Sequence, residues 1–306
     1  MRPDIWIPDS APAVERERLA SLANVFLFPA TGPIPVVAGH GDILIAGEHP
    51  DRAFDYAPHI AGLKAIQAFS AGVDSILDRV PAGVILCDAR GVHDVAVAEW
   101  VVMAILAAQR RLPEHLEAQR AGRWQHERLT GDDLAGATVV LIGAGSIGTA
   151  VEARLAPFGA RIVRVARRPR PGVNTMADLP AILPTADIVV SLLPLTPETR
   201  GVIDATMLTA MRPGALLVNA SRGGIVDTAA LTAEVLAGRI RAALDVTDPE
   251  PLPDGHPLWT ATGVIVTPHV ASDVRRTDER AWQLAFEQVG RYARGEPLIN
   301  VVSEGY

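Results

Sequence analysis

Residues 138–148 read TVVLIGAGSIG, an apolar run that passes directly into three spaced glycines. The run TVVLI has the β-branched, apolar composition of a buried parallel strand. Gly143, Gly145 and Gly148, with Ser146 and Ile147 between the last two, have the G-x-G-x-x-G spacing, and a helical pattern follows at once. The first glycine permits a tight turn, the second lets the backbone approach a pyrophosphate, and the third lets the helix pack on the strand. The stretch predicts a dinucleotide-binding loop, with a purely structural glycine turn as the alternative.

The next predicted strand, RIVRVA at 161–166, ends without the acidic residue that commonly binds the adenosine ribose about 20 residues after the glycines. Ala166 stands there, followed by Arg167 and Arg168. Guanidinium groups pair with a ribose 2′-phosphate, which a carboxylate would repel. We therefore expect NADP(H) as the preferred cofactor and NAD(H) as an alternative. The alternative interpretation of RRPRPG is an exposed basic turn without a binding role. The sequence indicates no role for Arg164, which lies within the strand.

Working outward from the glycine loop, short β-branched runs alternate with helical patterns in both directions. Strands are predicted at 4–7, 25–28, 42–46, 65–69 and 84–87, and again at 138–142, 161–166, 187–193, 215–220, 242–246 and 264–267. Helices are predicted at 13–23, 95–124 and 276–294, and Pro113 should end or kink the second of these. Apolar strands separated by helices are typical of parallel sheets covered on both faces.

Length and composition set further bounds. A chain of 306 residues exceeds the usual single domain, so we expect a dinucleotide-binding domain at 99–272 and a substrate domain at 1–98 that the tail, 273–306, returns to complete. A net charge of −7 argues against a general nucleic-acid or membrane-surface binder. The single cysteine, Cys87, rules out an intrachain disulfide framework and is interpreted as a small buried side chain. The sequence shows no signal-peptide pattern and no long apolar run, so we expect a cytoplasmic location. We assign no metal ligands.

Three further stretches contain candidate catalytic side chains. VNASRGGIVD surrounds Arg222, ALDVTDPEPLP surrounds Glu250, and VTPHVAS surrounds His269. Each follows the carboxyl end of a predicted strand, where open α/β sheets bind their ligands. Taken singly, each has a more ordinary interpretation: Arg222 as a surface ion-pair residue, Glu250 as a loop carboxylate and His269 as a structural histidine.

Taken together and in order, these motifs resemble those of the D-isomer-specific 2-hydroxyacid dehydrogenases. The resemblance covers most of the chain: AGVD (71–74), RGVHDVAVAEW (90–100), GAGSIG (143–148), LLPLTPETRG (192–201), NASRGGIVD, ALDV, EPLP, PLW and TPHVAS. It implies two doubly wound α/β domains, a Rossmann-type cofactor domain inserted in a flavodoxin-like substrate domain built from both chain ends. It also implies a homodimer, with the helical segment after AEW in the interface. Trp100 replaces the histidine of the more usual AEH, a change expected to alter packing and not chemistry.

The resemblance also assigns roles to residues. Arg222 would bind the substrate carboxylate and polarise the adjacent carbonyl, a task suited to a planar, permanently charged group. His269 would give a proton to that carbonyl as hydride arrives, and Glu250 would hold the imidazole and favour its charged form. Contacts to the substrate carboxylate from the other domain are implied for Ala71 and Gly72, and contacts to the cofactor for Thr196, Ala220, Ser221 and, near the nicotinamide carboxamide, Asp245.

The sequence thus predicts hydride transfer between NADP(H) and a small 2-oxoacid, with glyoxylate or hydroxypyruvate as the expected substrate. One alternative is a phosphite dehydrogenase, which shares the Arg, Glu and His. Formate dehydrogenases carry Gln at the position of Glu250 and are disfavoured. An alternative of another class is a dinucleotide-sensing binding protein of the same fold, which would not turn over any 2-oxoacid.

Overall fold

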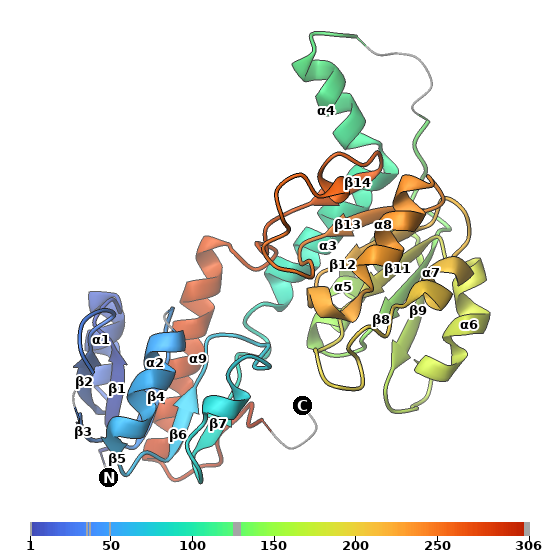
Figure 1. Cartoon of the computed structure of the whole chain (residues 1–306). Helices are drawn as coiled ribbons and strands as arrows, with labels where there is room; N and C mark the ends of the chain where they lie inside the picture. Colours follow the sequence, from blue (N-terminus) through green and yellow to red (C-terminus); the bar gives the residue numbers. More distant parts are fainter. Residues whose placement is uncertain (1, 35, 37, 49, 125–129, 303–306) are drawn as a thin grey trace. The chain divides into compact units, whose positions relative to one another are not determined.

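The structure, a computed structural model, describes residues 2–34, 36, 38–48, 50–124 and 130–302, which form two compact units (Figure 1). Unit 1 comprises Met1–His93 and Val274–Tyr306, and unit 2 comprises Asp94–Asp273. The expected boundary after residue 98 lies after residue 93 instead, because helix α3 (Asp94–Gln109) packs in the core of unit 2 from Val97 onwards. The second boundary follows residue 273, one residue later than expected.

Unit 1 is built on a parallel sheet of five strands in the order β2-β1-β4-β6-β7. These are β1 (Asp4–Pro8), β2 (Asn24–Phe28), β4 (Ile43–Ile45), β6 (Ala65–Gln67) and β7 (Ile85–Cys87). Numbered among themselves they have the 2-1-3-4-5 order of flavodoxin-like folds. A separate parallel pair, β3 (Gly39–His40) with β5 (Ile60–Ala61), is absent from the sequence prediction, since two residues are too few to show a strand pattern.

Both faces of this sheet are covered. Ile5 and Ile7 point to one face, where they share a core with Leu19 of α1 (Ala13–Ala20) and with Trp282 of α9 (Arg275–Ala293). Trp6 points to the other face, whose core includes α2 (Pro50–Tyr56). The alternation along β1 therefore accounts for the two helical layers.

The end of the chain returns to the sheet edge in unit 1. Val301 forms an antiparallel bridge with Cys87, and the Asp88 N–H donates to the Asn300 carbonyl at 2.9 Å. This contact seals Cys87, whose side chain is fully buried. Burial raises the pKa of its thiol to about 12, so the group is a neutral packing element, as expected from VILCDA.

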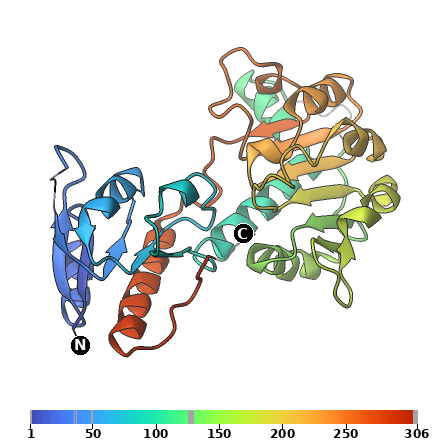
Figure 2. The same ribbon diagram turned by 60° about the horizontal axis from the view of Figure 1, so that its bottom comes forward.

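Unit 2 contains a parallel sheet of seven strands in the order β10-β9-β8-β11-β12-β13-β14 (Figure 2). They are β8 (Thr138–Ile142), β9 (Arg161–Ala166), β10 (Asn174–Thr175), β11 (Ile188–Ser191), β12 (Leu216–Asn219), β13 (Arg241–Leu244) and β14 (Val264–Val266). This is the Rossmann order 3-2-1-4-5-6 with one strand added at the edge. All eleven strands expected from the sequence occur, and among the described residues of this unit only the two-residue β10 is unpredicted.

Helices cover both faces of the unit 2 sheet. The core under one face includes α3 and α5 (Ser146–Leu155), with Trp100 buried in it. The core under the other is covered by α6 (Leu179–Ile182), α7 (Ala205–Ala210) and α8 (Thr228–Leu236). Single turns of 3₁₀ helix occur at Ala57–His59, Leu77–Arg79, Ala156–Phe158, Met176–Asp178, Leu183–Thr185, Gly223–Ile225 and Pro257–Trp259. None of the helices in the described part of the chain combines the length and apolar character needed to cross a membrane.

The long helical segment breaks near Pro113, as predicted. Helix α3 ends at Gln109, Arg111 takes a left-handed conformation with φ 54°, and α4 (Leu112–Arg120) begins with Pro113 in its first turn. Proline lacks the N–H that a helix interior needs, whereas the first turn tolerates it. In Figure 1, α4 stands away from the sheet of unit 2, and Ala118 is its one buried residue.

Candidate active site

The glycine loop joins β8 to α5 with the geometry that its spacing predicts. Gly143 has φ +116°, and a Cβ there would lie 2.6 Å from the Leu192 carbonyl oxygen. A Cβ on Gly148 would lie 2.2 Å from the Gly143 oxygen, so a larger residue at either position would displace backbone. Gly145 begins α5 without a side-chain cap, and a Cβ there would meet nothing within 4 Å. The uncapped helix N-terminus and the open space beside it fit a bound pyrophosphate.

A cavity of about 530 Å³ adjoins this loop. Its lining residues are Leu141, Ala144, Gly145, Gly148, Thr149, Arg164, Arg170, Pro171 and Val173. Arg164 points from β9 to the same side as α5 and forms an ion pair with Glu152 at 3.6 Å. The cavity is therefore partly cationic, although no role for Arg164 follows from the sequence.

A tight turn brings Arg170 back to the glycine loop. The Val173 N–H donates to the Arg170 carbonyl at 3.0 Å, and Gly172 has φ +70°, which makes Arg170–Val173 a type II turn with Pro171 at its second position. The Arg170 guanidinium donates to the Ala144 carbonyl. Sequence analysis missed Arg170, and the Pro171–Gly172 pair is the signal that could have placed it.

Arg167 and Arg168 follow β9 directly, and both side chains are exposed. Glu198 lies near enough that Arg167 contributes to lowering the pKa of its carboxyl group, after the larger effect of a hydrogen bond from Thr196. Thr196 begins a turn in which its N–H donates to Thr199 Oγ1 at 2.8 Å. The expected cofactor residues Arg167 and Thr196 thus lie near one carboxylate, while the arginines among the cavity's lining residues are Arg164 and Arg170.

His269 and Glu250 form a direct pair. The distance from His269 Nδ1 to Glu250 Oε1 is 2.6 Å, and the two side chains are 44% and 42% exposed. A carboxylate only accepts hydrogen bonds, so Nδ1 carries the proton and donates it to Glu250. This leaves Nε2 as the nitrogen that can exchange a proton with a ligand.

Hydrogen bonds to the buried Asp245 hold the His269 loop. Its carboxylate is buried and accepts from Thr267 Oγ1 at 2.6 Å and from the N–H groups of Val270 and Ala271, each at 2.9 Å. Its backbone carbonyl accepts from the His269 N–H at 2.7 Å. His269 has φ +56°, a left-handed conformation that is uncommon outside glycine, and these bonds on both sides of it hold the backbone there.

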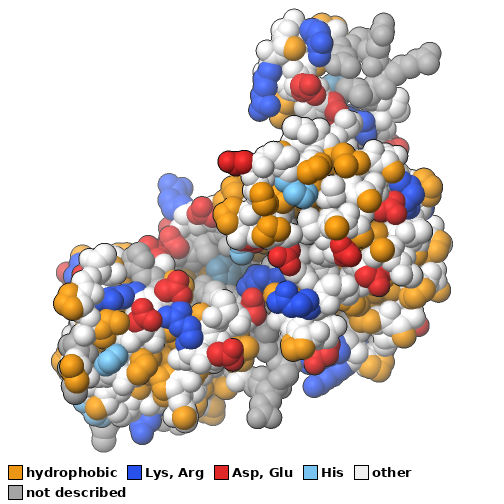
Figure 3. All heavy atoms as spheres, in the orientation of Figure 1, with side chains coloured by type: hydrophobic (Ala, Val, Ile, Leu, Met, Phe, Trp, Pro, Cys, Tyr) orange, Lys and Arg blue, Asp and Glu red, His pale blue; other side chains and the backbone are white. Residues whose placement is uncertain are grey.

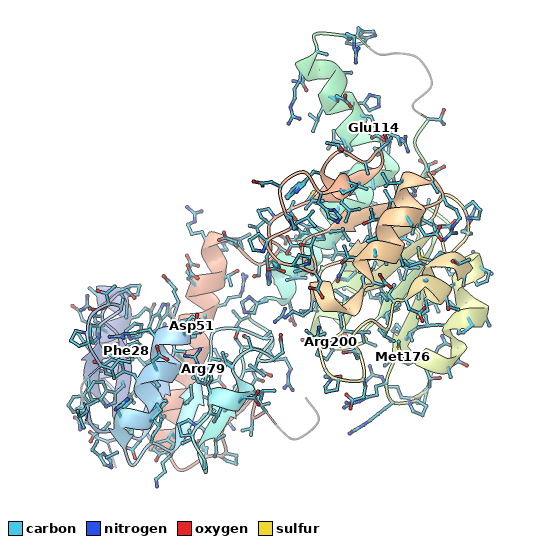
Figure 4. All side chains as sticks on the ribbon, in the orientation of Figure 1. Phe28, Asp51, Arg79, Glu114, Met176 and Arg200 are labelled. Carbon is cyan, nitrogen blue, oxygen red and sulfur yellow. The ribbon has the colours of Figure 1, made fainter. Side chains whose placement is uncertain are left out.

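Arg222 stands on a turn at the end of β12. Its carbonyl accepts from Asn219 Nδ2 at 2.9 Å, and its Nη1 donates to the Ser221 carbonyl at 2.8 Å. The half-buried Ala220 and the buried Ser221 lie in the same turn. Arg200, labelled in Figure 4, comes from the loop after β11, and its Nη1 lies 3.1 Å from where a Cβ on Gly224 would be. A second guanidinium therefore approaches the backbone just beyond Arg222.

The strands that precede these groups are neighbours in one sheet. Asn219 pairs with Leu244, and Leu244 pairs with Val266. The loops with Arg222, Glu250 and His269 therefore leave the same edge from β12, β13 and β14 in turn. Such an edge can offer a cation to an anionic ligand beside a supported proton donor. Ala71 and Gly72 belong to unit 1, and their contribution to this site stays a prediction.

The chain is similar to proteins of one family. Residues 102–271 match the family model described as D-isomer specific 2-hydroxyacid dehydrogenase, NAD binding domain. Human glyoxylate reductase/hydroxypyruvate reductase is 34% identical over 316 aligned positions that cover 96% of each chain.

Two solved structures are similar over nearly the whole chain. A D-isomer specific 2-hydroxyacid dehydrogenase from Xanthobacter autotrophicus, in complex with NADPH and MES, has a TM-score of 0.80 and 30% identity over 99% of this chain and 98% of its own. An NADPH-dependent glyoxylate/hydroxypyruvate reductase from Sinorhizobium meliloti, in complex with NADP and sulfate, has a TM-score of 0.82 and 27% identity over the same shares. With the family model matching more than half of the chain, this protein belongs to the D-isomer-specific 2-hydroxyacid dehydrogenases and is an NAD(P)-dependent oxidoreductase.

Proposed function

We propose that the enzyme reduces a small 2-oxoacid to the D-2-hydroxyacid with NADPH, and that glyoxylate or hydroxypyruvate is the substrate. The observation that carries this proposal is the 2.6 Å contact between His269 Nδ1 and Glu250 Oε1, which leaves Nε2 as the proton donor on a loop at the same sheet edge as the loop of Arg222. The human and Sinorhizobium relatives, named for glyoxylate and hydroxypyruvate, support the choice of substrate.

Four side chains of the site have a task in this scheme. Arg222 binds the substrate carboxylate, because a fixed guanidinium matches two carboxylate oxygens. His269 Nε2 donates its proton to the keto oxygen, and Glu250 stabilises the imidazolium before that transfer. In the oxidative direction Nε2 takes the proton back. Asp245 keeps the His269 loop in place through the buried hydrogen bonds described above.

We propose NADP(H) as the preferred cofactor; when bound, it supplies the hydride. The glycine loop and the N-terminus of α5 would hold its pyrophosphate. Arg167, Arg168 and the cavity residues Arg164 and Arg170 supply cationic side chains for a ribose 2′-phosphate, and Ala166 removes the acidic residue that would repel it. The NADPH and NADP complexes of the two solved relatives support the same choice.

Turnover with a panel of acids tests the proposal. Glyoxylate, hydroxypyruvate, pyruvate and phosphite are each assayed with both cofactors, beside an Arg222→Lys enzyme that keeps the charge but not the two-pronged geometry. We expect glyoxylate or hydroxypyruvate with NADPH to give the highest kcat/KM and Arg222→Lys to reduce it by about tenfold or more. Phosphite oxidation without 2-oxoacid reduction would support the phosphite alternative, and cofactor binding with no turnover would support the sensor.

We also propose that the enzyme is a homodimer and acts in the cytoplasm. The homodimer is supported by exposed apolar side chains on α3 and α4, among them Met103, Leu112 and Leu116. The cytoplasm is a reducing compartment, and the single cysteine, which is buried and un-ionised, is compatible with it.

A further inference from the structure

A buried chain of polar side chains lies beneath Arg222. Asn219 is 1% exposed, yet all of its side-chain polar atoms are used. Its Oδ1 accepts from the Ser221 N–H at 3.2 Å and from Ser221 Oγ at 2.7 Å, and its Nδ2 donates to the Arg222 carbonyl at 2.9 Å. Ser221 Oγ lies 3.0 Å from Ser191 Oγ, on the neighbouring strand end.

The chemistry of these groups fixes the direction of every bond. The Arg222 carbonyl only accepts, so the amide nitrogen of Asn219 must face it, and the amide oxygen must face the Ser221 N–H. The Ser221 hydroxyl therefore donates its one proton to Asn219 Oδ1, and the Ser191 hydroxyl donates to Ser221 Oγ. A flipped amide would place two donors together and two acceptors together, so one arrangement is satisfied.

The opposite side of the same turn is also fixed. A Cβ on Gly223 would lie 1.9 Å from the Thr247 carbonyl oxygen, so the backbone after Arg222 packs directly against the chain that follows β13. Backbone contact thus limits movement on one side. On the other, the Arg222 carbonyl accepts from Asn219 Nδ2 at 2.9 Å and, over a longer 3.3 Å, from the Ile225 N–H, so the Asn219 amide is its shorter partner. A side chain that holds its neighbour's backbone also sets where that neighbour's side chain begins.

We infer that Asn219 is a positioning residue that aims the Arg222 guanidinium at the substrate carboxylate. The inference rests on the proposed role of Arg222 and extends it to a residue whose side chain is buried beneath the turn. Asn219 is suited to this task because a single side chain must both accept an N–H and donate to a carbonyl, which an aspartate or a serine cannot do in the same geometry.

Direct binding of oxamate, a non-reducible 2-oxoacid analogue, tests the inference in the enzyme–NADPH complex. Asn219→Asp keeps the shape of the side chain but faces the Arg222 carbonyl with an oxygen, and Asn219→Ala removes all three bonds. Each variant should bind oxamate about tenfold or more weakly, while the Kd for NADPH changes by less than about threefold. Ser191→Ala is the matched control, since it removes the far end of the same network and should change oxamate binding by less than about twofold.

A double-mutant cycle separates positioning from general support of the fold. In an Arg222→Ala background, Asn219→Ala should cause no further loss of oxamate binding beyond about twofold, because its effect passes through Arg222. Equal loss of NADPH and oxamate affinity, additive losses in the cycle, or an Asn219→Ala chain that does not fold would each overturn the inference. If Arg222→Ala itself binds oxamate normally, the proposed carboxylate role has failed. If it binds poorly while both Asn219 variants bind well, the positioning role alone has failed.

Discussion

At the scale of single residues, His269 decides the chemistry. It is held in a left-handed conformation by bonds to Asp245 and Thr267, and its Nδ1 is paired with Glu250. His269→Ala should lower kcat for 2-oxoacid reduction by about 100-fold or more, because the keto oxygen then lacks its proton donor. The Kd for NADPH, measured by fluorescence, should stay within about threefold. Near-normal turnover would remove His269 from the mechanism.

Glu250 acts on the same proton through charge. The carboxylate accepts from His269 Nδ1 at 2.6 Å, and its negative charge stabilises the imidazolium that donates the proton. Glu250→Gln keeps a hydrogen-bond acceptor but removes that charge, so the imidazolium loses its stabilising partner. We expect kcat for reduction to fall by about tenfold or more, while thermal unfolding changes little because both side chains are partly exposed. An unchanged kcat would contradict a role for Glu250 in supporting the charge.

Residue types and their order could be predicted from the sequence, but their hydrogen-bond partners could not. Arg222, Glu250 and His269 each follow a strand end, and that pattern is visible in the sequence. The three bonds to the Asp245 carboxylate and the turn closed by Asn219 depend on the backbone path of two loops. Spacing alone carries no information about that path, so Asn219 was not singled out.

At the scale of elements, the segment after β9 should set cofactor choice. Arg167→Ala with Arg168→Ala, and separately Arg170→Ala, should each weaken NADPH binding by about tenfold or more and leave NADH binding within about twofold, because only NADPH carries the 2′-phosphate. Arg161→Ala is the matched control: it is an exposed arginine at the start of β9 that is not among the cavity's lining residues.

Salt provides an independent check on this element. These side chains are exposed, so the preference for NADPH should decrease between low and moderate ionic strength. Equal affinity of the wild type for NADH and NADPH would mean that the arginines form only a solvated turn. If only the Arg170 variant loses NADPH affinity, the cavity beside the glycine loop binds the phosphate and Arg167 and Arg168 do not.

The elements also show where sequence patterns lose power. The apolar strand β8 was predicted with its observed bounds, and each of its residues is buried. The strands β3, β5 and β10 have two residues each. So short a strand shows no alternating pattern in the sequence, and its position depends on loops that other elements bring together. The helix break at Arg111 was signalled by Pro113, although the left-handed residue precedes the proline by two positions.

At the scale of the whole molecule, strand order follows from connection rules once the strands are known. Parallel strands joined by helical crossovers yield the two doubly wound sheets, and the family resemblance predicted which segments form each unit. The return of the tail is less visible in the sequence. Its antiparallel bridge between Val301 and Cys87 involves single residues and leaves no periodic pattern.

The apolar surface of α3 and α4 leads to the last prediction, which concerns assembly. Leu112 and Leu116 are 45% and 39% exposed and lie one helical turn apart, so they share one face of α4. Figure 3 shows hydrophobic and charged side chains together on the part of unit 2 that α4 forms. A projecting helix with an apolar face gains stability by packing against a second copy of the chain.

We therefore expect a dimer by light scattering, and we expect Leu116→Glu to shift it towards monomer by placing a charge in the contact. Leu236→Glu is the matched control, because Leu236 is an exposed leucine, at 59%, at the end of α8 in the same unit. Both substitutions replace an exposed helical leucine, so their effects on the monomer should be similarly small. A difference in assembly between them then reports on the α4 face alone. A wild-type monomer, or a Leu116→Glu dimer of unchanged affinity, would show that this face is not the interface.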